Sequence, residues 1–587
     1  MNLTQLRAAA LGARIGATLG APRRGEREFR AISFYEPIPS RMAPADFLDA
    51  WLVWRNHLSE SLPPECIGDT RLEHWQSCRT EAIFGESNLS AGLRPPISGQ
   101  FDNPLGSSGS ALARCLFWGL ALPPEEAGDY AWFDASCDQG RDVAKVAFAM
   151  ARACSSIGLM PWLRALIDAL GNDQSLRSVV QIAMNGVTTG VPFDTFAKSL
   201  ARTVDDPDEF GLKFNLAVIV ASLCEGKGEF DASLLACASC GGAADTNCAI
   251  VGALCALWAG SVPLAWTEPL SGDYVATASL KKIDPPASWE SYVDAIFPTE
   301  PPEIVEEATP TPMRSMPMIA PNSSTYFNDD LRVTTEFVDS PVSVQGKSNQ
   351  ILLTVQNLSP YPRIIAPIWD VAPGVELAHR FMSVLIKPGS KHQFPMVVSG
   401  PPNQDLVTVQ IGGLKIPIKL LSCLDWYSCG PMPNYDGTSF EKVFRCEDVQ
   451  RLSETFAGRG DQGVRWKRFT GQSNAVNVEP LFLGGPGVAY LYGKFRFAQP
   501  GVHKIVVASS PGTVVRVNRN IVIKYLDTHQ PVARPRPPYV AEFRADGTVE
   551  VIIKVMRDLV TVPCCTVYFI GPDGQIAHPI ESLPMED

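Results

Sequence analysis

Two short segments place an Asp-Thr pair directly ahead of a helical run. Asp69-Thr70 follows Cys-Ile-Gly, and Asp245-Thr246 follows Gly-Gly-Ala-Ala. A carboxylate beside a hydroxyl offers two oxygen ligands to a hard cation such as Mg²⁺. The same residues also cap the N-terminus of a helix, which contributes about 1 kcal/mol. Spacing alone favours the cap for each segment, but two such pairs together indicate a shared site more strongly than either one does.

The elements that must position these pairs are helical from residue 1 to about 297. Apolar residues recur at three- and four-residue spacing in residues 143–157, 161–170 and 214–224, which predicts an all-α domain. The uncharged stretch 248–266 is broken at Gly260 and Pro263. The helix that remains, about twelve residues, is too short to span a bilayer. We therefore expect a buried core helix here and no membrane partner.

The chain changes character after the helical domain. Residues 298–328 are rich in Pro and Ser and predict an extended linker. Short stretches with a period of two follow, separated by Pro, Gly and Asn turns. They predict an immunoglobulin-like β-sandwich over 329–422 and a jelly-roll or related sandwich over 423–587. The fold class is thus a helical bundle followed by two all-β sandwich domains.

Composition limits the partners and the compartment. The net charge of −12 argues against a nucleic-acid-binding surface and against docking on anionic lipid. The fifteen cysteines show no framework spacing, and free thiols in a reducing cytoplasm fit them better than a zinc site at Cys237-x-x-Cys240. The N-terminal segment lacks an uninterrupted apolar core because Arg14 breaks it, so we interpret it as part of the folded domain. We therefore expect a cytoplasmic protein.

Several blocks of the first 275 residues resemble the ADP-ribosylglycohydrolase family, in its bacterial branch. Residues 12–22 (GARIGATLGAP) look like the family's opening helix, whose glycines at every fourth position allow close packing. Gly68-Asp69-Thr70 falls at its Thr-Asp-Asp-Thr motif, and residues 241–246 match its Gly-x-Asp-x-Asp-Thr motif. Residues 92–111 resemble its mid-domain segments. Members fold as orthogonal helical bundles, bind two Mg²⁺ and cleave the bond that joins ADP-ribose to a side chain or small molecule.

The resemblance implies a set of site residues in this chain. Asp69 and Asp245 would act in catalysis near an oxocarbenium-like centre. The implied metal ligands are Asp69, Thr70, Asp245 and Thr246, and the implied substrate-binding residues are Gly99, Asn103, Ser110 and Gly242. The expected partner is an ADP-ribosylated or glycosylated small molecule or protein.

The sequence also departs from the family pattern. Ala243 replaces the first Asp of the C-terminal motif, and two upstream ligand positions read Ile67 and Gly68. The acid that commonly follows Gly-Ala-Pro is replaced in the run ending at Arg24. Fewer carboxylates weaken Mg²⁺ binding, so the pattern allows one ion or none. The family usually carries His in a segment that corresponds to residues 134–140 here. Asp134, Asp138 and the nearby Asp142 either supply the missing acids or form a solvated cluster at a helix start, and we favour the solvated cluster.

Two functions therefore stay open. The first is a Mg²⁺-assisted hydrolase of an ADP-ribosyl or related N- or O-glycosidic bond, with a partly degenerate metal site. The second is a non-catalytic relative that binds ADP-ribose-like or glycosyl ligands, or serves as an interaction scaffold. The last β domain resembles galactose-binding-like modules, and the sequence leaves open whether the β domains bind glycan, protein or nothing. Its tryptophans Trp426 and Trp466 either form a sugar-stacking platform or, as we favour, lie in the core.

Overall fold

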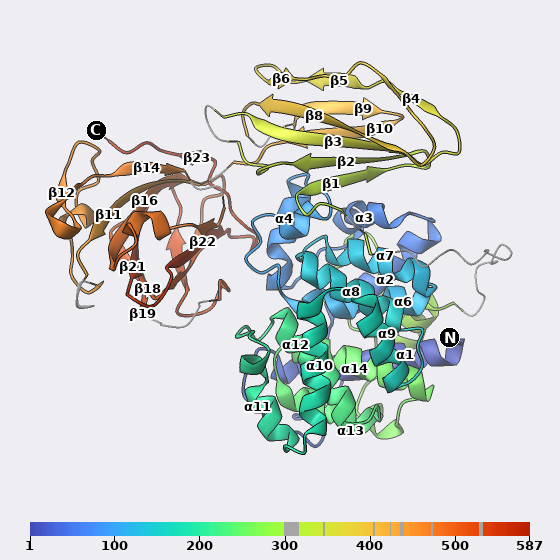
Figure 1. Cartoon of the computed structure of the whole chain (residues 1–587). Helices are drawn as coiled ribbons and strands as arrows, with labels where there is room; N and C mark the ends of the chain where they lie inside the picture. Colours follow the sequence, from blue (N-terminus) through green and yellow to red (C-terminus); the bar gives the residue numbers. More distant parts are fainter. Residues whose placement is uncertain are drawn as a thin grey trace. The chain divides into compact units, whose positions relative to one another are not determined.

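The computed structural model describes residues 1–298, 316–317, 319–343, 347–402, 405–422, 424–434, 440–470, 473–526 and 532–586. The chain divides into two compact units: Met1–Phe101 with Gly106–Phe327, and Asp102–Leu105 with Asn328–Asp587. The first unit is built of helices and the second of strands (Figure 1). This confirms the predicted fold class. Most of the predicted linker lies outside the described residues, and its end forms strand β1 (Ser323–Phe327).

Fifteen α-helices occur in the described part of the first unit. They are α1 (Leu3–Gly20), α2 (Asp46–Ser59), α3 (Ile67–His74), α4 (Ile83–Ser90), α5 (Ile97–Gln100), α6 (Leu112–Ala121), α7 (Pro124–Ala135), α8 (Arg141–Ala153), α9 (Leu159–Ala169), α10 (Gln174–Thr188), α11 (Phe193–Thr203), α12 (Leu212–Glu225), α13 (Phe230–Cys240), α14 (Ala244–Ala259) and α15 (Trp289–Ile296).

Helix α14 lies in the centre of this unit. Every residue from Ala244 to Leu257 is buried, and the helix ends where Gly260 adopts a left-handed conformation (φ +70°). This confirms the expected buried core helix. In the described part of the chain, no helix is both long enough and apolar enough to cross a bilayer.

Helix α1 packs directly against α14 through its glycines. A Cβ atom added to Gly12, Gly16 or Gly20 would lie well under 3.0 Å from a backbone carbonyl oxygen of α14. The first turn of α1 is fixed by a capping box, in which Asn2 and Gln5 exchange side-chain and backbone hydrogen bonds of 2.9 and 3.0 Å. The small residues thus bring the opening helix into backbone contact with the helix that carries Asp245.

The second unit consists of several antiparallel sheets. One contains β2-β3-β8-β6 in this order and another β10-β9-β5, while β4 pairs with β7. A seven-stranded sheet runs β14-β11-β16-β21-β18-β19 with β23 paired to β16, a four-stranded sheet runs β15-β22-β17-β20, and β12 pairs with β13. The principal strands are β2 (Leu331–Phe337), β3 (Asn349–Asn357), β8 (Lys391–Ser399), β9 (Asp405–Ile411), β10 (Leu414–Lys419), β11 (Asp425–Met432), β16 (Gly487–Arg496), β17 (Val502–Ser510), β18 (Gly512–Val517), β19 (Asn520–Leu526), β21 (Thr548–Arg557) and β22 (Cys564–Ile570).

The shorter strands complete these sheets. They are β4 (Arg363–Ile365), β5 (Ile368–Val371), β6 (Glu376–Ala378), β7 (Val384–Ile386), β12 (Phe456–Ala457), β13 (Gly463–Val464), β14 (Lys467–Thr470), β15 (Ala475–Val476), β20 (Val540–Arg544) and β23 (Glu581–Ser582). Burial alternates residue by residue along β2 and β3, which matches the predicted period of two. Trp426 and Trp466 are both buried. The expectation of core aromatics is confirmed, and a sugar-stacking platform on these two residues is wrong.

A buried carboxylate on α2 makes the stability of the helical unit depend on pH. Asp49 accepts hydrogen bonds from Tyr274 (2.5 Å) and the Thr277 amide (2.9 Å), and burial raises its pKa from 3.8 to about 6. Between these values the folded state keeps a proton that the unfolded chain releases, so stability falls as the pH rises through this window. Asparagine cannot ionise, so we expect Asp49→Asn to lose this pH dependence and to gain about 2 kcal/mol of stability relative to the unmodified chain between pH 4 and pH 7.

Urea unfolding at pH 4 and pH 7 measures this effect. Relative to the unmodified chain, Asp49→Asn should have a higher free energy of unfolding at pH 7 than at pH 4. A difference that does not change between the two pH values would contradict the assignment.

Candidate functional site

The glycine turn before α14 places Asp245 inside the first helical turn. Gly241 and Gly242 have φ values of +73° and +71°, a region that favours glycine. The N-cap is Ala243, so Asp245 is the second helical residue and not the cap that spacing alone favoured. Its Oδ1 accepts a hydrogen bond of 2.9 Å from the Thr246 amide. The carboxylate is therefore directed at neighbouring elements and not only at its own helix.

Two arginines meet at Asp245. Arg24 donates from an Nη to Oδ1 at 2.7 Å, and Arg79 forms an ion pair with Oδ2 at 2.6 Å. Arg24 lies just after the opening helix, and Arg79 comes from the segment between α3 and α4. The Asp245 side chain is only 8% exposed, against 22% for Arg24 and 16% for Arg79. Both oxygens of this buried carboxylate are thus bound by guanidinium groups.

A second set of acids holds the two arginines in place. The other Nη of Arg24 lies 2.5 Å from the buried carboxylate of Glu81, and its guanidinium stacks on the Phe210 ring at 4.6 Å. Arg79 donates through Nε to Asp46 at 2.9 Å. We call Arg24, Arg79, Glu81, Asp46 and Asp245 the Asp245 cluster.

Charge pairing dominates the electrostatics of the Asp245 cluster. Burial alone would raise the pKa of Asp245, but Arg79 and Arg24 outweigh it and hold that pKa well below its ordinary value. Burial also opposes ionisation of Asp46, and Arg79 and Ser77 reverse its effect in the same way, so its pKa is lowered. These acids are therefore ionised at neutral pH and neutralised by guanidinium groups.

The first Asp-Thr pair does not share these partners. Asp69 on α3 is 58% exposed and pairs with Arg94 at 2.6 Å. The Thr70 hydroxyl is buried and lies 2.8 Å from Nδ1 of His57, whose Nε2 faces the Pro63 carbonyl oxygen at 3.2 Å. Donation from Nε2 to that carbonyl leaves Nδ1 to accept from Thr70.

The four predicted ligands therefore have different partners. Asp69 and Thr70 bond to Arg94 and His57, Asp245 bonds to two other arginines, and Thr246 is buried beside Asp245. Their metal-binding role stays a prediction.

The predicted substrate-binding residues fall in three places. Gly99 donates its amide to the Ser136 carbonyl at 3.1 Å, and the Ser110 hydroxyl accepts from Gln139 at 3.4 Å, so both contact the turn that follows α7. Gly242 pairs with the chain just after Arg24, through its carbonyl to the Gly25 amide and its amide to the Glu26 carbonyl, both at 2.8 Å. Asn103 falls in the short stretch grouped with the second unit and binds the Leu105 amide through its side chain at 3.0 Å.

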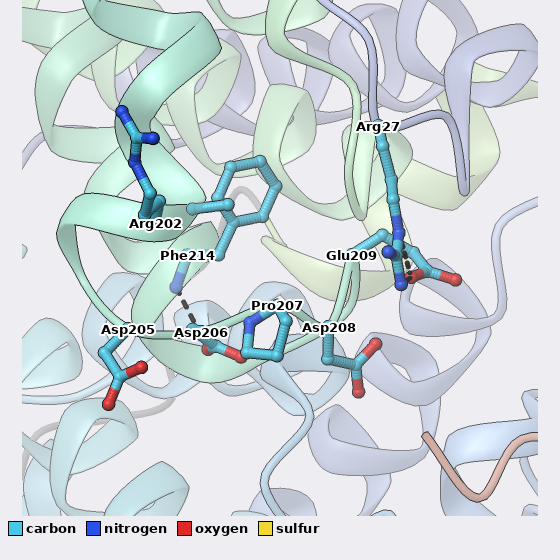
Figure 2. Close-up of a pocket in the computed structure, with 9 residues that line it drawn as sticks. Arg27, Arg202, Asp205, Asp206, Pro207, Asp208, Glu209 and Phe214 are labelled. Atoms are coloured by element: carbon cyan, nitrogen blue, oxygen red, sulfur yellow. Dashed lines mark hydrogen bonds and ion pairs between the residues drawn. The ribbon is translucent and has the colours of Figure 1, made fainter. Parts of the chain in front are cut away.

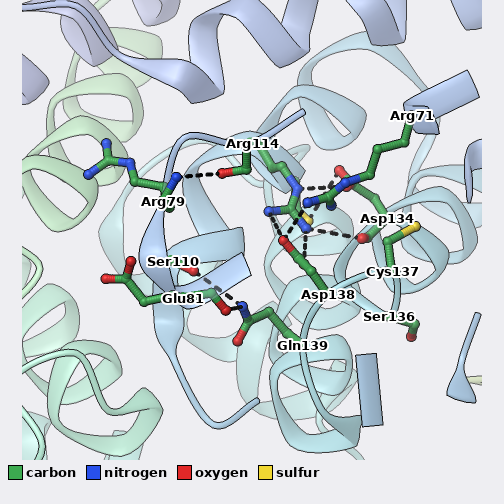
Figure 3. Close-up of polar contacts among 12 residues, drawn as sticks. Arg71, Arg79, Glu81, Ser110, Arg114, Asp134, Ser136, Cys137, Asp138 and Gln139 are labelled. Atoms are coloured by element: carbon green, nitrogen blue, oxygen red, sulfur yellow. Dashed lines mark hydrogen bonds and ion pairs between the residues drawn. The ribbon is translucent and has the colours of Figure 1, made fainter. Parts of the chain in front are cut away.

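Beside the turn that follows α7 lies a fully buried ionic network (Figure 3). Arg114 on α6 binds Asp134 at 2.7 Å and Asp138 at 2.5 Å, and Arg71 on α3 binds Asp138 at 2.7 Å and Glu86 at 2.5 Å. Both guanidinium groups lie over the Trp75 ring, at 4.5 Å for Arg71 and 5.5 Å for Arg114.

The expectation of a solvated acidic cluster is therefore wrong for two of its three members. Asp134 and Asp138 are 0% exposed because Arg71 and Arg114 draw them into the core. It holds for Asp142, which is exposed and pairs with Lys145 at 2.9 Å. Neither buried acid is free to complete a metal site.

Gln139 connects the buried network to the Asp245 cluster. The residue follows Asp138, and its Nε2 donates to the backbone carbonyl of Glu81 at 3.0 Å (Figure 3). Nothing in the local sequence marks Arg79, Glu81 or Arg114 as site residues. Arginine and glutamate in helical segments look like ordinary surface residues, so only their burial reveals the role.

A cavity of about 380 Å³ lies beside the glycine turn. Phe214 and Pro207 contribute apolar walls, and Arg27 forms another wall with Glu209 at 2.7 Å (Figure 2). A Cβ on Gly242 would touch the Phe214 ring at 2.7 Å, so the cavity adjoins the predicted substrate-binding turn. Its size falls in the range of small-molecule sites. The remaining lining residues are Ala201, Arg202, Asp205, Asp206 and Asp208.

The donor set does not fit the two Mg²⁺ ions that the family implies. A dinuclear site needs several carboxylate oxygens directed at the ions. Both oxygens of Asp245 already face Arg24 and Arg79, and Ala243 supplies no ligand. Across the described ranges, no group of three or more His, Cys, Asp or Glu side chains is placed to hold a metal ion.

Residues 4–288 match the family model described as ADP-ribosylglycohydrolase, which confirms the resemblance for the helical part of the chain. No curated protein matches the sequence.

Among solved structures, an "ADP-ribosylglycohydrolase-related protein complex" is 18% identical, covers 46% of this chain and 93% of its own, and has a TM-score of 0.34. An anti-sigma factor domain-containing protein is 12% identical (TM-score 0.18; 41% and 84% covered). Another anti-sigma factor domain-containing protein, from Clostridium clariflavum, is 9% identical, covers 42% of this chain and 89% of its own, and has a TM-score of 0.19. With TM-scores this low, none of the three supports an inference about this chain.

Proposed function

We propose that the helical unit is a non-catalytic relative of the ADP-ribosylglycohydrolases that binds an ADP-ribose-like or other glycosyl ligand without Mg²⁺-assisted hydrolysis. The observation that carries the proposal is the state of Asp245, the one acid kept from the C-terminal motif. Two guanidinium groups bind its oxygens at 2.7 and 2.6 Å. A carboxylate so engaged neither holds a cation nor takes a proton readily.

The cavity beside the glycine turn is the proposed ligand site. Phe214 offers an aromatic face and Arg27 a partly exposed guanidinium group. We expect Ala201→Trp, which fills the cavity from α11, to weaken ADP-ribose binding about tenfold or more, a loss of roughly 1.4 kcal/mol. The exposed Ala232 on α13 provides the matched control, since Ala232→Trp adds the same side chain away from the cavity. If both variants bind ADP-ribose with equal affinity, the cavity is not the ligand site.

Calorimetry with ADP-ribose in EDTA, together with a release assay on a panel of ADP-ribosylated substrates, tests the function. We expect binding without added metal and no release of ADP-ribose. An absence of binding heat would contradict the ligand class. The family match favours the second candidate, a Mg²⁺-assisted hydrolase. Release that requires Mg²⁺ and disappears in Asp245→Ala would establish that candidate and overturn ours.

The β-rich unit is proposed to contact a glycan or protein partner, in a cytoplasmic setting. Any such contact must use residues other than Trp426 and Trp466, because both are in the core.

A further inference from the structure

We infer that Arg24 and Arg79 are built-in counter-cations that have replaced the metal ions of the family at the glycine turn. The inference rests on the same Asp245 geometry as the proposed function, but it concerns the metal and not the ligand. A chain that fails to bind ADP-ribose would therefore leave it standing.

The position of Arg24 supports this replacement. Arg24 lies in the run where the resemblance places an acid, and Ala243 stands where it places an aspartate. The Arg24 side chain reaches across to Asp245 and binds it at 2.7 Å. Arg24 thus replaces one carboxylate of the family pattern, and Ala243 removes another. The new cation, Arg24, bonds to Asp245, the carboxylate of the C-terminal motif that remains.

Buried acids other than Asp245 also hold both guanidinium groups in place. Glu81 binds Arg24 at 2.5 Å and Asp46 binds Arg79 at 2.9 Å, and both acids are buried. Ser77 donates to Asp46 at 2.7 Å, and Phe210 stacks against Arg24 at 4.6 Å. Each guanidinium group is therefore held from its other side as well as by Asp245. A cation approaching Asp245 would have to displace groups that have their own buried partners.

The charge balance of the Asp245 cluster also disfavours two Mg²⁺ ions. The Asp245 cluster contains three carboxylates and two guanidinium groups, so its net charge is −1. Two Mg²⁺ ions bring four positive charges, which three carboxylates do not balance even if both arginines move away. A single ion would meet repulsion from the guanidinium groups at the same oxygens.

Reversing the two sequence changes tests the inference. In Arg24→Glu/Ala243→Asp, one guanidinium group leaves Asp245 and two carboxylates are added. We expect the unmodified chain to give no Mg²⁺ binding heat at millimolar metal. The double variant should bind Mg²⁺ at least tenfold more tightly than the unmodified chain. Arg30→Glu is the matched control, because Arg30 is half-exposed and pairs with Glu36, away from Asp245.

The unmodified chain alone decides the inference if the double variant fails to fold. Mg²⁺ binding by the unmodified chain that Asp245→Asn abolishes would overturn it. A folded double variant that binds Mg²⁺ no better than Arg30→Glu would also overturn it. Absence of binding in the unmodified chain, with gain in the double variant, supports the inference whether or not ADP-ribose binds.

Discussion

Gly16→Ala is expected to prevent the helical unit from folding stably. The added Cβ would lie well under 3.0 Å from the carbonyl oxygen and carbon of Cys248, in the second turn of the buried helix α14. Backbone atoms of a central helix cannot move aside as a flexible side chain does, so α1 and α14 would have to separate. Losses above about 4 kcal/mol are exceptional, and we expect one here because the clash lies at the closest backbone contact.

Thermal unfolding followed by circular dichroism at helical wavelengths measures this loss. Gly272→Ala is the matched control, since a Cβ there meets nothing within 4 Å. Near-normal unfolding of the control with loss of the transition in Gly16→Ala is the predicted result. A Gly16→Ala chain that unfolds within a few degrees of the unmodified one would show that the two helices do not pack this closely.

Arg114→Met is expected to cost about 3–5 kcal/mol of stability, the range observed when one partner is removed from a buried ion pair. The arginine neutralises Asp134 and Asp138, which are fully buried on the turn after α7. Methionine leaves these two carboxylates with Arg71 as the remaining guanidinium in the network. The cost comes from the uncompensated buried charge and not from lost packing volume.

Lys198→Met removes a cation from an exposed pair with Asp194 and serves as the control. Such surface pairs contribute about 0–1 kcal/mol. Urea unfolding of the two variants should therefore give losses that differ several-fold. Equal losses would indicate that the Arg114 network is solvated in solution.

Periodicity carried most of the fold prediction. Helix α9 begins and ends within a few residues of the predicted range 161–170 because only one of its faces is buried, and the spacing of apolar residues reports that face. The glycines of α1 predicted a close helix contact, which α14 provides. Strand β1 was missed because its residues follow a Pro-rich stretch and show no alternation strong enough to separate them from it.

The candidate site was predictable in position but not in its pairing. Asp245 and Gly242 lie at one turn, as the motif indicated. Arg79 lies far from Asp245 in sequence, and a long flexible side chain carries no periodicity that would reveal its target. Asp138 looked like a solvated residue because nothing in its local sequence shows that Arg114 and Arg71 approach it. Buried ion pairs form between distant segments, so they emerge only from the fold.

A crystal structure of the unmodified chain grown with millimolar Mn²⁺ tests the central claim most directly. Mn²⁺ takes the same hard oxygen ligands as Mg²⁺ and is located by its anomalous scattering. We predict no anomalous peak beside Asp245, with Arg24 and Arg79 still hydrogen-bonded to its two carboxylate oxygens. A peak within bonding distance of Asp245, with either guanidinium group displaced, would contradict the account.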